Sequence, residues 1–452
     1  MLKGKWNIME KLPPMLSGEE LKRKLEIKPV YDESVRLKSR SERLMALNDI
    51  YNVYLPSVMS EEIYSKLYLA MLRSLQKKEG KTAIQQRNEN GRRIRGIEGS
   101  VCGYQGIIGG SDSFTIIGSS GIGKSSAISR AISIATENRI VEIESPYCKI
   151  LPAIVVQCPF DCSVKSLLLQ ILRQIDMELD SHYYDMAVKA RATTDMLIGS
   201  VSQIALNHVG LLVVDEIQNV VNHKQGRSLI GMLTQLINNS GISICMVGTP
   251  EASLFFESVD YLSRRALGLR YGNCEYNAYF REFCSLLFSY QYVENKSVIS
   301  ESVTQWLYEH SAGVSATVVS LIHDAQEISI LNGREVLDMA ALNEAYEQRM
   351  GMMHSHIKPS VTKKTAIEKK KRDNASDMIG RSQQNEKEQT SPSDETVYDT
   401  VQKSDSDCVI HSADKGDVPD WTFLELAEYA KRNQCDVLSL LKGKISITEI
   451  AV

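Results

Sequence analysis

The residues with the clearest chemistry form a glycine-rich turn, GSSGIGKSS, directly after the apolar run FTII. They are Gly118, Ser119, Ser120, Gly121, Ile122, Gly123, Lys124, Ser125 and Ser126. Glycines let backbone N–H groups turn inward around an anion, and a helix beginning at Lys124 adds the positive end of its dipole. In the spacing G-x-x-x-x-G-K-S, the lysine reaches the β- and γ-phosphates and the Ser125 hydroxyl completes the Mg²⁺ shell. The turn therefore predicts a site for ATP and Mg²⁺.

An acidic pair follows a second apolar run, LLVVDEIQN. Asp215 and Glu216 come at the carboxyl end of this predicted strand, where ligands bind in open α/β sheets. We expect Asp215 to position Mg²⁺ through water and Glu216 to orient and activate the attacking water. An Asp-Glu pair alone is weak evidence. Together with the phosphate-binding turn, it indicates hydrolysis as well as binding.

Further polar residues follow along the chain. The run MVGTP places Thr249 where a side chain can contact the γ-phosphate, although a simple turn residue also fits. The stretch YLSRRALGLR carries Arg264 and Arg265 at the end of a helical pattern. An arginine there can reach the γ-phosphate of a neighbouring subunit, and the alternative is a solvated basic helix end. A shared site of this kind requires an oligomer.

The elements that would position these residues are apolar strands that alternate with amphipathic helices. The predicted strands are 113–118, 151–158, 210–216, 241–248 and 267–271, with helical patterns at 163–175 and 226–239. Continuous apolar strands separated by helices are typical of a parallel sheet covered on both faces. The predicted fold class is therefore an α/β P-loop nucleotide-binding core.

The rest of the chain divides by composition. We expect an N-terminal arm and helix at 1–84, with Ser60 as the helix N-cap, the nucleotide-binding core at 85–275 and a helical lid at 276–352. The polar stretch 353–416 cannot bury enough apolar surface to fold and is predicted to be a disordered linker. Residues 417–452 contain a Trp-bearing helical pattern, which favours a partner-docking segment.

Composition limits the classes of function. The chain has 452 residues and a formal net charge of −4, so contact with nucleic acid requires a local basic patch. The 9 cysteines include the pair in CPFDC but no second pair at metal-ligand spacing, which favours reduced thiols over a metal site. No apolar run reaches the roughly 18 residues that span a bilayer, and no signal peptide is evident. We expect a cytoplasmic protein.

The order of these motifs resembles that of an AAA+ ATPase, and within that superfamily the TnsC/TniB group of transposition regulators. The supporting residues are TIIGSSGIGKSSAISRAI, LLVVDEIQNV, MVGTPEA and SRRA, with an upstream arm whose pattern is also similar to TnsC-type proteins. The resemblance covers roughly residues 35–350. One departure lies in the lid, where Ala316 and Thr317 occupy the region in which many AAA+ proteins place a nucleotide-sensing arginine.

The resemblance implies a specific role. TnsC-like proteins bind ATP, assemble head-to-tail into rings or filaments on duplex DNA, and bridge a target-selection protein to the transposase before hydrolysis disassembles the complex. It therefore implies non-specific double-stranded DNA as a partner and a homo-oligomer, hexameric or heptameric per turn. Transposase subunits would be contacted through the C-terminal tail, and the target-selection protein through the N-terminal arm or the core.

Candidate DNA contacts lie between the two nucleotide motifs, where family members place DNA-facing loops. Such contacts need basic and hydroxyl groups that face phosphates. The candidates are Ser163, Lys165, Lys189, Arg191, Thr193 and Thr194. The alternative is that they are ordinary charges and caps at helix ends.

Two other classes of protein stay open. One is a different AAA+ machine, such as a helicase loader or a secretion-associated ATPase. The other is a nucleotide switch that binds ATP and hardly hydrolyses it, against which Glu216 and the arginine pair argue.

Overall fold

The computed structural model describes residues 11–80, 82–85, 113–138, 140–144, 147–257 and 268–351. Several predicted features lie outside these residues: most of the loop before residue 113, Arg264 and Arg265, the linker 353–416 and the segment 417–452. None of the described helices is long and apolar enough to cross a membrane.

The N-terminal part of the described chain consists of short helices followed by one long helix. The elements are α1 (Gly18–Leu25), η2 (Glu33–Leu37), α2 (Arg40–Ala46), η3 (Leu47–Asn52) and α3 (Val58–Lys78). The predicted N-cap of the long helix is wrong by one turn: Ser57 caps it, and its side chain accepts a hydrogen bond from the Ser60 N–H. The Ser60 hydroxyl in turn accepts from the Ser57 N–H at 3.1 Å. The two serines therefore form a reciprocal capping box.

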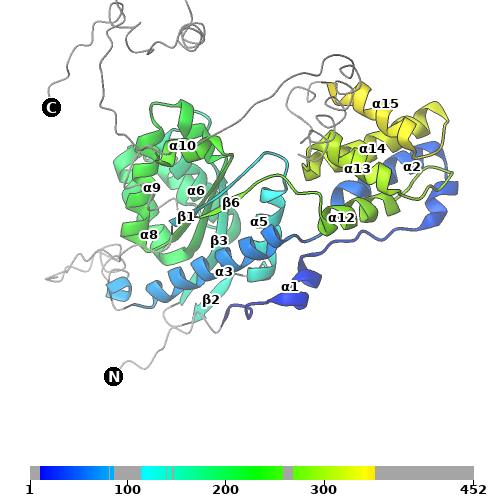
Figure 1. Ribbon diagram of the computed structural model, residues 1–452. Helices are drawn as coiled ribbons and strands as arrows, with labels where there is room; N and C mark the ends of the chain where they lie inside the picture. The colour runs from blue at the N-terminus through cyan, green and yellow to red at the C-terminus, as the bar shows by residue number, and fades with distance from the viewer. Residues whose placement is uncertain are drawn as a thin grey trace, which may run out of the picture. The chain divides into compact units, whose positions relative to one another are not determined.

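The core of the chain is a six-stranded sheet, of which β1, β2, β3 and β6 are labelled in Figure 1. The strands are β1 (Ser113–Gly118), β2 (Val141–Glu144), β3 (Tyr147–Gln157), β4 (Val209–Asp215), β5 (Ser243–Gly248) and β6 (Leu269–Tyr271). Their order is β2-β3-β4-β5-β1-β6, and all pairs are parallel except the antiparallel pair β2–β3. The predicted α/β class is confirmed. Strand β2 was not predicted, because four residues are too few to give a distinct pattern.

Helices cover both faces of the sheet, as the strand sequences require. In β4, Leu212 and Val214 face one buried cluster, whereas Leu211 and Val213 face the other. This is the alternation of successive side chains in a strand. The first cluster includes residues of α6 (Val164–Leu179), α8 (Thr194–His208) and α9 (Gly226–Ser240), and the second includes α1, α3 and α5 (Lys124–Thr136). The shorter helices of the core are α7 (Tyr183–Lys189), η4 (Ile217–Asn222) and α10 (Glu251–Glu257).

The helices after β6 are α12 (Ala278–Ser289), α13 (Glu301–Ser311), α14 (Ser315–Asn332) and α15 (Met339–Arg349). They lie in the segment predicted as a helical lid, and the name lid is kept for them. Their buried side chains form a third cluster that also contains Leu47, Ile50, Val53 and Leu55. The N-terminal segment thus contributes to two cores: α1 and α3 pack on the sheet, whereas the residues between them pack in the lid. The Ile27 and Tyr54 backbones pair where the segment leaves and re-enters the core, through two hydrogen bonds of 2.9 Å.

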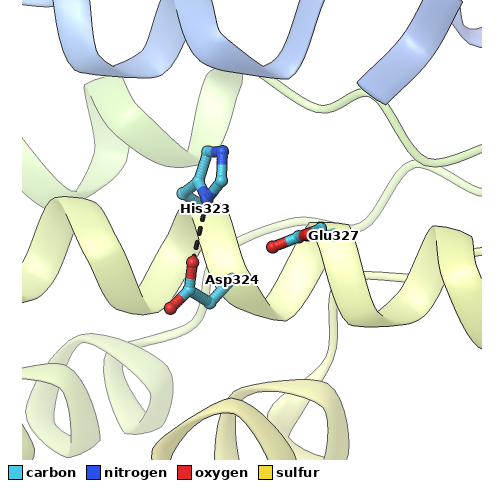
Figure 2. A group of neighbouring side chains, drawn as sticks. All are labelled: His323, Asp324 and Glu327. Atoms are coloured by element: carbon cyan, nitrogen blue, oxygen red, sulfur yellow. Dashed lines mark hydrogen bonds and ion pairs between the residues drawn. The ribbon is translucent and has the colours of Figure 1, made fainter. Parts of the chain in front are cut away.

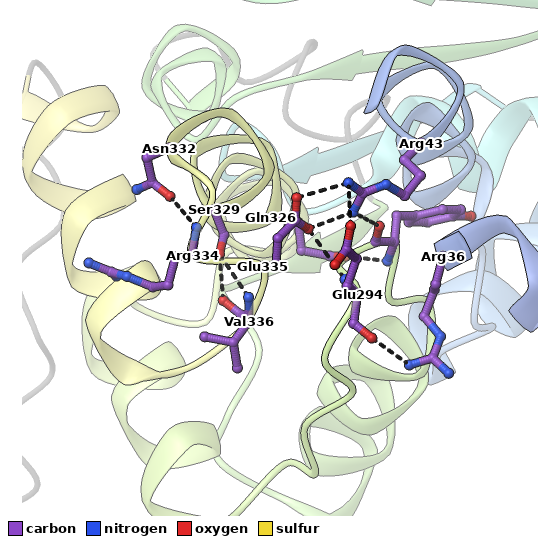
Figure 3. Close-up of polar contacts among 10 residues, drawn as sticks. Arg36, Arg43, Glu294, Gln326, Ser329, Asn332, Arg334, Glu335 and Val336 are labelled. Atoms are coloured by element: carbon purple, nitrogen blue, oxygen red, sulfur yellow. Dashed lines mark hydrogen bonds and ion pairs between the residues drawn. The ribbon is translucent and has the colours of Figure 1, made fainter. Parts of the chain in front are cut away.

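A buried ion pair fixes the N-terminal segment to the lid (Figure 3). The Arg43 side chain of α2 is 4% exposed and donates to both carboxylate oxygens of Glu335, one of them at 2.5 Å and the other at 2.8 Å. It also donates to the Tyr292 carbonyl at 3.2 Å and lies 3.4 Å from Glu294. Gln326 of α14 completes this layer by accepting from the Tyr292 N–H at 2.7 Å. The arm segment is therefore integral to the lid.

Candidate nucleotide site

The phosphate-binding turn links β1 to α5, as its sequence predicts. Gly121 and Gly123 have φ values of 78° and 94°, a left-handed conformation that glycine adopts without strain. Gly118 is needed for a different reason: a Cβ there would lie 2.6 Å from Ile122 Cδ1 and 3.0 Å from the Tyr271 carbonyl oxygen. The glycines thus shape a turn whose residues lie between strand and helix N-terminus, where backbone N–H groups are free to bind anions.

Lys124 begins α5 and is buried beneath this turn. Its ammonium donates to the carbonyl oxygens of Gly118 and Ser119 at 2.7 and 2.9 Å. Burial lowers the pKa of Lys124, while the charges of Asp215 and Glu216 act in the opposite direction. Neutral carbonyls satisfy the donors without neutralising the charge, so this cation is suited to an anionic ligand.

Ser125 and Asp215 connect the turn to the acidic strand. The Ser125 hydroxyl donates to Asp215 Oδ2 at 3.0 Å, although the two residues are 90 positions apart in the sequence. Both groups are hard oxygen donors of the kind that Mg²⁺ prefers. The structure therefore brings together two residues that were predicted separately as Mg²⁺-binding.

Glu216 follows Asp215 in a left-handed conformation, with φ 58° and ψ 34°. A non-glycine residue in this region is strained, and such strain is common at functional sites. Its N–H donates to Asp215 Oδ1 at 2.8 Å, and its exposed carboxylate accepts a hydrogen bond from the Gln218 side chain. The backbone turn thus separates the two carboxyl groups, with Asp215 facing the phosphate turn and Glu216 held by Gln218.

Gln218 is a residue that the sequence analysis did not assign. Its Nε2 donates to Glu216, and its Oε1 accepts from the Thr249 N–H at 3.2 Å. A Cβ on Gly248 would lie 2.8 Å from this oxygen, so glycine makes room for the amide. Gln218 therefore links Glu216 to the end of β5, where Thr249 lies with its hydroxyl 3.4 Å from Glu251 Oε2. The only sequence signal for it was its position two residues after Glu216.

Beside the phosphate turn lies a cleft of about 680 Å³, a size typical of small-molecule sites. It is bordered by α1, the start of α3, the segment from β6 to α12, and by Ile122 and Ser315. Tyr271 and Tyr279 supply aromatic surface, and Leu55, Pro56 and Met59 supply aliphatic surface. Its charged residues are Glu19, Glu26, Glu61, Glu275, Glu282, Lys22, Arg23 and Arg270. Since the acids outnumber the bases, the cleft suits a neutral group better than a phosphate.

The candidate DNA contacts lie at helix ends of the core. Ser163 caps α6, and Thr193 caps α8 by accepting from the Met196 N–H at 3.4 Å. Lys165, Lys189 and Arg191 are exposed, while Thr194 is the first residue of α8 and is partly buried. The side chains of Ser163 and Thr193 thus have a structural role as caps, and the three cations are free to reach an external partner.

A separate group of ionisable side chains lies on α14 and is shown in Figure 2: His323, Asp324 and Glu327. It is the only set of three potential metal ligands found among the described residues. His323 Nδ1 lies 2.9 Å from Asp324 Oδ1, the Tyr51 ring packs 4.7 Å from the imidazole, and Glu327 pairs with Arg349 at 3.6 Å. These partners account for the three groups without a cation.

Cys158 and Cys162 are both buried free thiols, and burial raises the pKa of Cys158 to about 12.

The strand order, the phosphate turn after β1 and the acidic pair after β4 define the class as an α/β P-loop nucleotide-binding core. Residues 110–267 match the family model described as "Bacterial TniB protein". This confirms the resemblance expected from the sequence, and the match spans both nucleotide motifs. No curated protein matches the sequence.

Solved structures give more distant likenesses. The Aeropyrum pernix ORC1 protein, in complex with DNA, is 16% identical with a TM-score of 0.39, over 59% of this chain and 64% of that chain, slightly less than two thirds of its length. Drosophila ORC bound to DNA is 14% identical with a TM-score of 0.41, over 76% of this chain and 71% of that chain. Domain III of the Thermotoga maritima replication initiation protein DnaA is 14% identical with a TM-score of 0.31, over 52% of this chain and 82% of that chain.

Proposed function

We propose that this chain is an ATP-hydrolysing regulator of transposition that assembles on duplex DNA when ATP is bound and is released by hydrolysis. The observation that carries the nucleotide part is the 3.0 Å hydrogen bond between Ser125 and Asp215, with buried Lys124 beside it. The regulatory part rests on the match of residues 110–267 to the TniB family.

Each residue of the site has a distinct part in hydrolysis. Lys124 exchanges its two carbonyl partners for phosphate oxygens, which carry the negative charge that carbonyls lack. Ser125 and Asp215 would hold Mg²⁺, which neutralises charge on the phosphates when bound. Glu216 accepts a proton from the attacking water and orients it, and Thr249 contacts the γ-phosphate. Gln218 holds the Glu216 carboxylate near the end of β5.

The cleft is proposed as the site for the base of the nucleotide. Ile122 belongs to the phosphate turn and also borders the cleft, so one ligand can occupy both. Tyr271 and Tyr279 offer aromatic surface to a purine, which buries a flat apolar face. A neutral base avoids the repulsion that the excess of carboxylates would exert on a phosphate.

DNA binding and assembly complete the proposal. Lys165, Lys189 and Arg191 would contact phosphates of duplex DNA without reading its sequence, helped by the hydroxyl groups of Ser163, Thr193 and Thr194. Arg264 or Arg265 would complete the site of a neighbouring subunit in a ring or filament. The C-terminal segment would bind transposase subunits, and the arm or core the target-selection protein.

The first test measures binding to duplex DNA of unrelated sequence by fluorescence anisotropy, with negative-stain imaging, in the presence of a non-hydrolysable ATP analogue, ADP or no nucleotide. We expect rings or filaments on DNA with the analogue and none with ADP. Glu216→Gln should bind DNA with ATP and turn over ATP at least about 100-fold more slowly. Failure to bind duplex DNA in every nucleotide state would overturn the transposition role and leave another AAA+ machine.

A nucleotide switch makes a different prediction for the same variant. If ATP is bound and hardly hydrolysed, Glu216→Gln and the wild type should show the same low turnover.

Three substitutions test the DNA contacts: Lys165→Ala, Lys189→Ala and Arg191→Ala. Each should reduce the salt dependence of DNA binding. Unchanged DNA affinity and salt dependence in all three would remove these residues from the interface.

A further inference from the structure

The lid reaches the phosphate turn through its own backbone. The Ala316 N–H, in the first turn of α14, donates to the Gly121 carbonyl oxygen at 3.0 Å. Gly121 is also shaped by this contact, since a Cβ there would lie 2.9 Å from Val314 Cγ1 and 3.3 Å from Ala316 Cβ. The lid and the phosphate turn are therefore fitted to each other at one peptide group.

Residues 312–316, which carry this N–H, form the lid turn, and hydrogen bonds hold it on a second side to the segment between β6 and α12. The Cys274 N–H donates to the Gly313 carbonyl at 3.0 Å, and the Asn273 side chain donates to the Ala312 carbonyl at 3.0 Å. Ala312 and Gly313 have φ values of 50° and 73°, and a Cβ on Gly313 would lie 2.1 Å from the Cys274 carbonyl oxygen. Two consecutive left-handed residues and two anchoring hydrogen bonds leave the lid turn little freedom.

The hydrogen bond has a geometric consequence for the phosphate site. The peptide unit between Gly121 and Ile122 is planar and trans, so its C=O and N–H point in opposite directions. When the carbonyl of Gly121 is held toward Ala316, the Ile122 N–H is directed away from the lid. Rotation of that peptide would therefore have two effects at once. It would move the Ile122 N–H, which faces the proposed phosphate site, and it would break the Ala316–Gly121 hydrogen bond.

We propose that the lid turn is a positioning element of the phosphate site, which couples nucleotide binding to the lid through the Ala316–Gly121 hydrogen bond instead of through an arginine side chain. This inference rests on the proposed nucleotide site. It assigns to the main chain of Ala316 a role in a region where the side chains, alanine and threonine, carry no charge. Ala316 acts through Gly121 and is not itself a catalytic residue.

Ala316→Pro is the sharpest test because it removes the donor and places the ring Cδ against the Gly121 carbonyl oxygen, so that this contact must open. Proline is tolerated in the first turn of a helix, although a helical residue such as Ser315 is disfavoured before it. Glu301→Pro is the matched control: it places the same ring at the first residue of α13, away from the cleft, after Ser300, whose φ of −109° and ψ of 161° suit a residue before proline. Ala316→Ser keeps the N–H and changes only the side chain.

The measurement is equilibrium binding of a fluorescent ATP analogue with Mg²⁺ to the full chain. Ala316→Pro should weaken binding by at least about 3- to 10-fold, the cost of one hydrogen bond. Glu301→Pro and Ala316→Ser should stay within about twofold of the wild type. Equal affinity in Ala316→Pro and the wild type, or an equal loss in Glu301→Pro, would overturn the proposal.

A second measurement on the wild type guards against a variant that fails to fold. Amide hydrogen exchange of peptides that cover the lid turn should slow when the ATP analogue binds, because the ligand fixes the Gly121 peptide. Exchange that is unchanged in the lid turn while it slows in the phosphate turn would contradict the coupling. If the wild type binds no nucleotide at all, the proposed function fails first, and the two failures are distinct.

Discussion

Lys124 in the core and Arg43 in the arm are both buried cations, and the difference between their partners separates a binding site from a structural joint. Among the described residues, Lys124 donates to two neutral carbonyls, and its burial lowers its pKa. Arg43 pairs with Glu335, and that hydrogen bond raises the pKa of Arg43. The Lys124 charge has no direct carboxylate partner among the described residues, although Asp215 and Glu216 lie near enough to favour it, so it can still bind an incoming anion. The Arg43 charge is already neutralised, so it stabilises the fold and offers nothing to a ligand.

Loss of the Arg43–Glu335 pair should destabilise the fold more than loss of Lys124. Arg43→Met leaves the carboxylate of Glu335, whose side chain is only 14% exposed, without its partner, which should lower the free energy of unfolding by about 3–5 kcal/mol. Urea or thermal unfolding measures the change, and Arg40→Met, an exposed residue of the same helix, serves as the control with a change under about 0.5 kcal/mol. The double variant Arg43→Met with Glu335→Leu should recover much of the loss. If Arg43→Met is as stable as the control, the pair is not a joint.

The binding cation should show the opposite pattern. Lys124→Ala should weaken binding of Mg²⁺-ATP by about 100-fold or more, since two charge-assisted contacts to phosphate are lost. The nucleotide-free protein should unfold within about 1 kcal/mol of the wild type, because a desolvated charge is removed with its two hydrogen bonds. Binding and unfolding assays on the same preparation test both statements, with Lys224→Ala as an exposed control. A large loss of stability would place Lys124 among the structural cations.

Gln218 lies between the two cases, because it touches a catalytic group without contacting ligand. Gln218→Ala frees the Glu216 carboxylate from its amide partner, and we expect turnover to change by about tenfold, the cost of one hydrogen bond to a charged group. Nucleotide affinity should stay within about twofold. Steady-state ATP hydrolysis and equilibrium binding separate the two quantities, and Gln218→Glu tests whether a like charge displaces Glu216. A change in affinity with unchanged turnover would contradict a positioning role.

The smallest expected effect is a pH dependence of the joint. The hydrogen bond from Arg43 lowers the pKa of Glu335 in the folded protein. The stabilisation from this pair is therefore complete above the pKa of an unfolded glutamate, about 4.3, and is lost as the pH falls through the lower folded value. Unfolding measured from pH 6 downward should show less of this loss in Glu335→Gln. An identical pH profile in the two proteins would show that Glu335 does not contribute.

The same contrast explains what could be predicted from the sequence. The phosphate turn and the Asp215–Glu216 pair were predictable because their chemistry depends on short spacings and on an apolar strand before each. Gln218 was not, because its role depends on the end of another strand, at Thr249. Ser60 was misassigned because both members of the Ser57–Ser60 capping box are serines. Only the backbone geometry shows which of the two is the N-cap and which is the third residue of the helix. The roles predicted for individual site residues stay predictions until the variants are made.

The place of the arm in the lid was also beyond prediction. Residues 47–55 have no pattern that distinguishes packing against the lid from packing against the sheet, and the partner residues lie far along the chain. The contact of Ala316 with Gly121 is a main-chain hydrogen bond, so the side chains of these residues gave no sign of it. Tertiary contacts of this kind become visible only when both segments are placed.

The joint between arm and lid also affects the order in which the chain folds. Arg43 and Glu335 are separated by 292 positions. At a synthesis rate of about 5–20 residues per second, the arm waits roughly 15 to 60 s on the ribosome before its ionic partner exists. Leu47, Ile50 and Val53 lack the lid helices that bury them during that time. The nascent chain therefore has a long interval in which its apolar arm needs protection from aggregation, and the lid can close its core only after α15 has been synthesised.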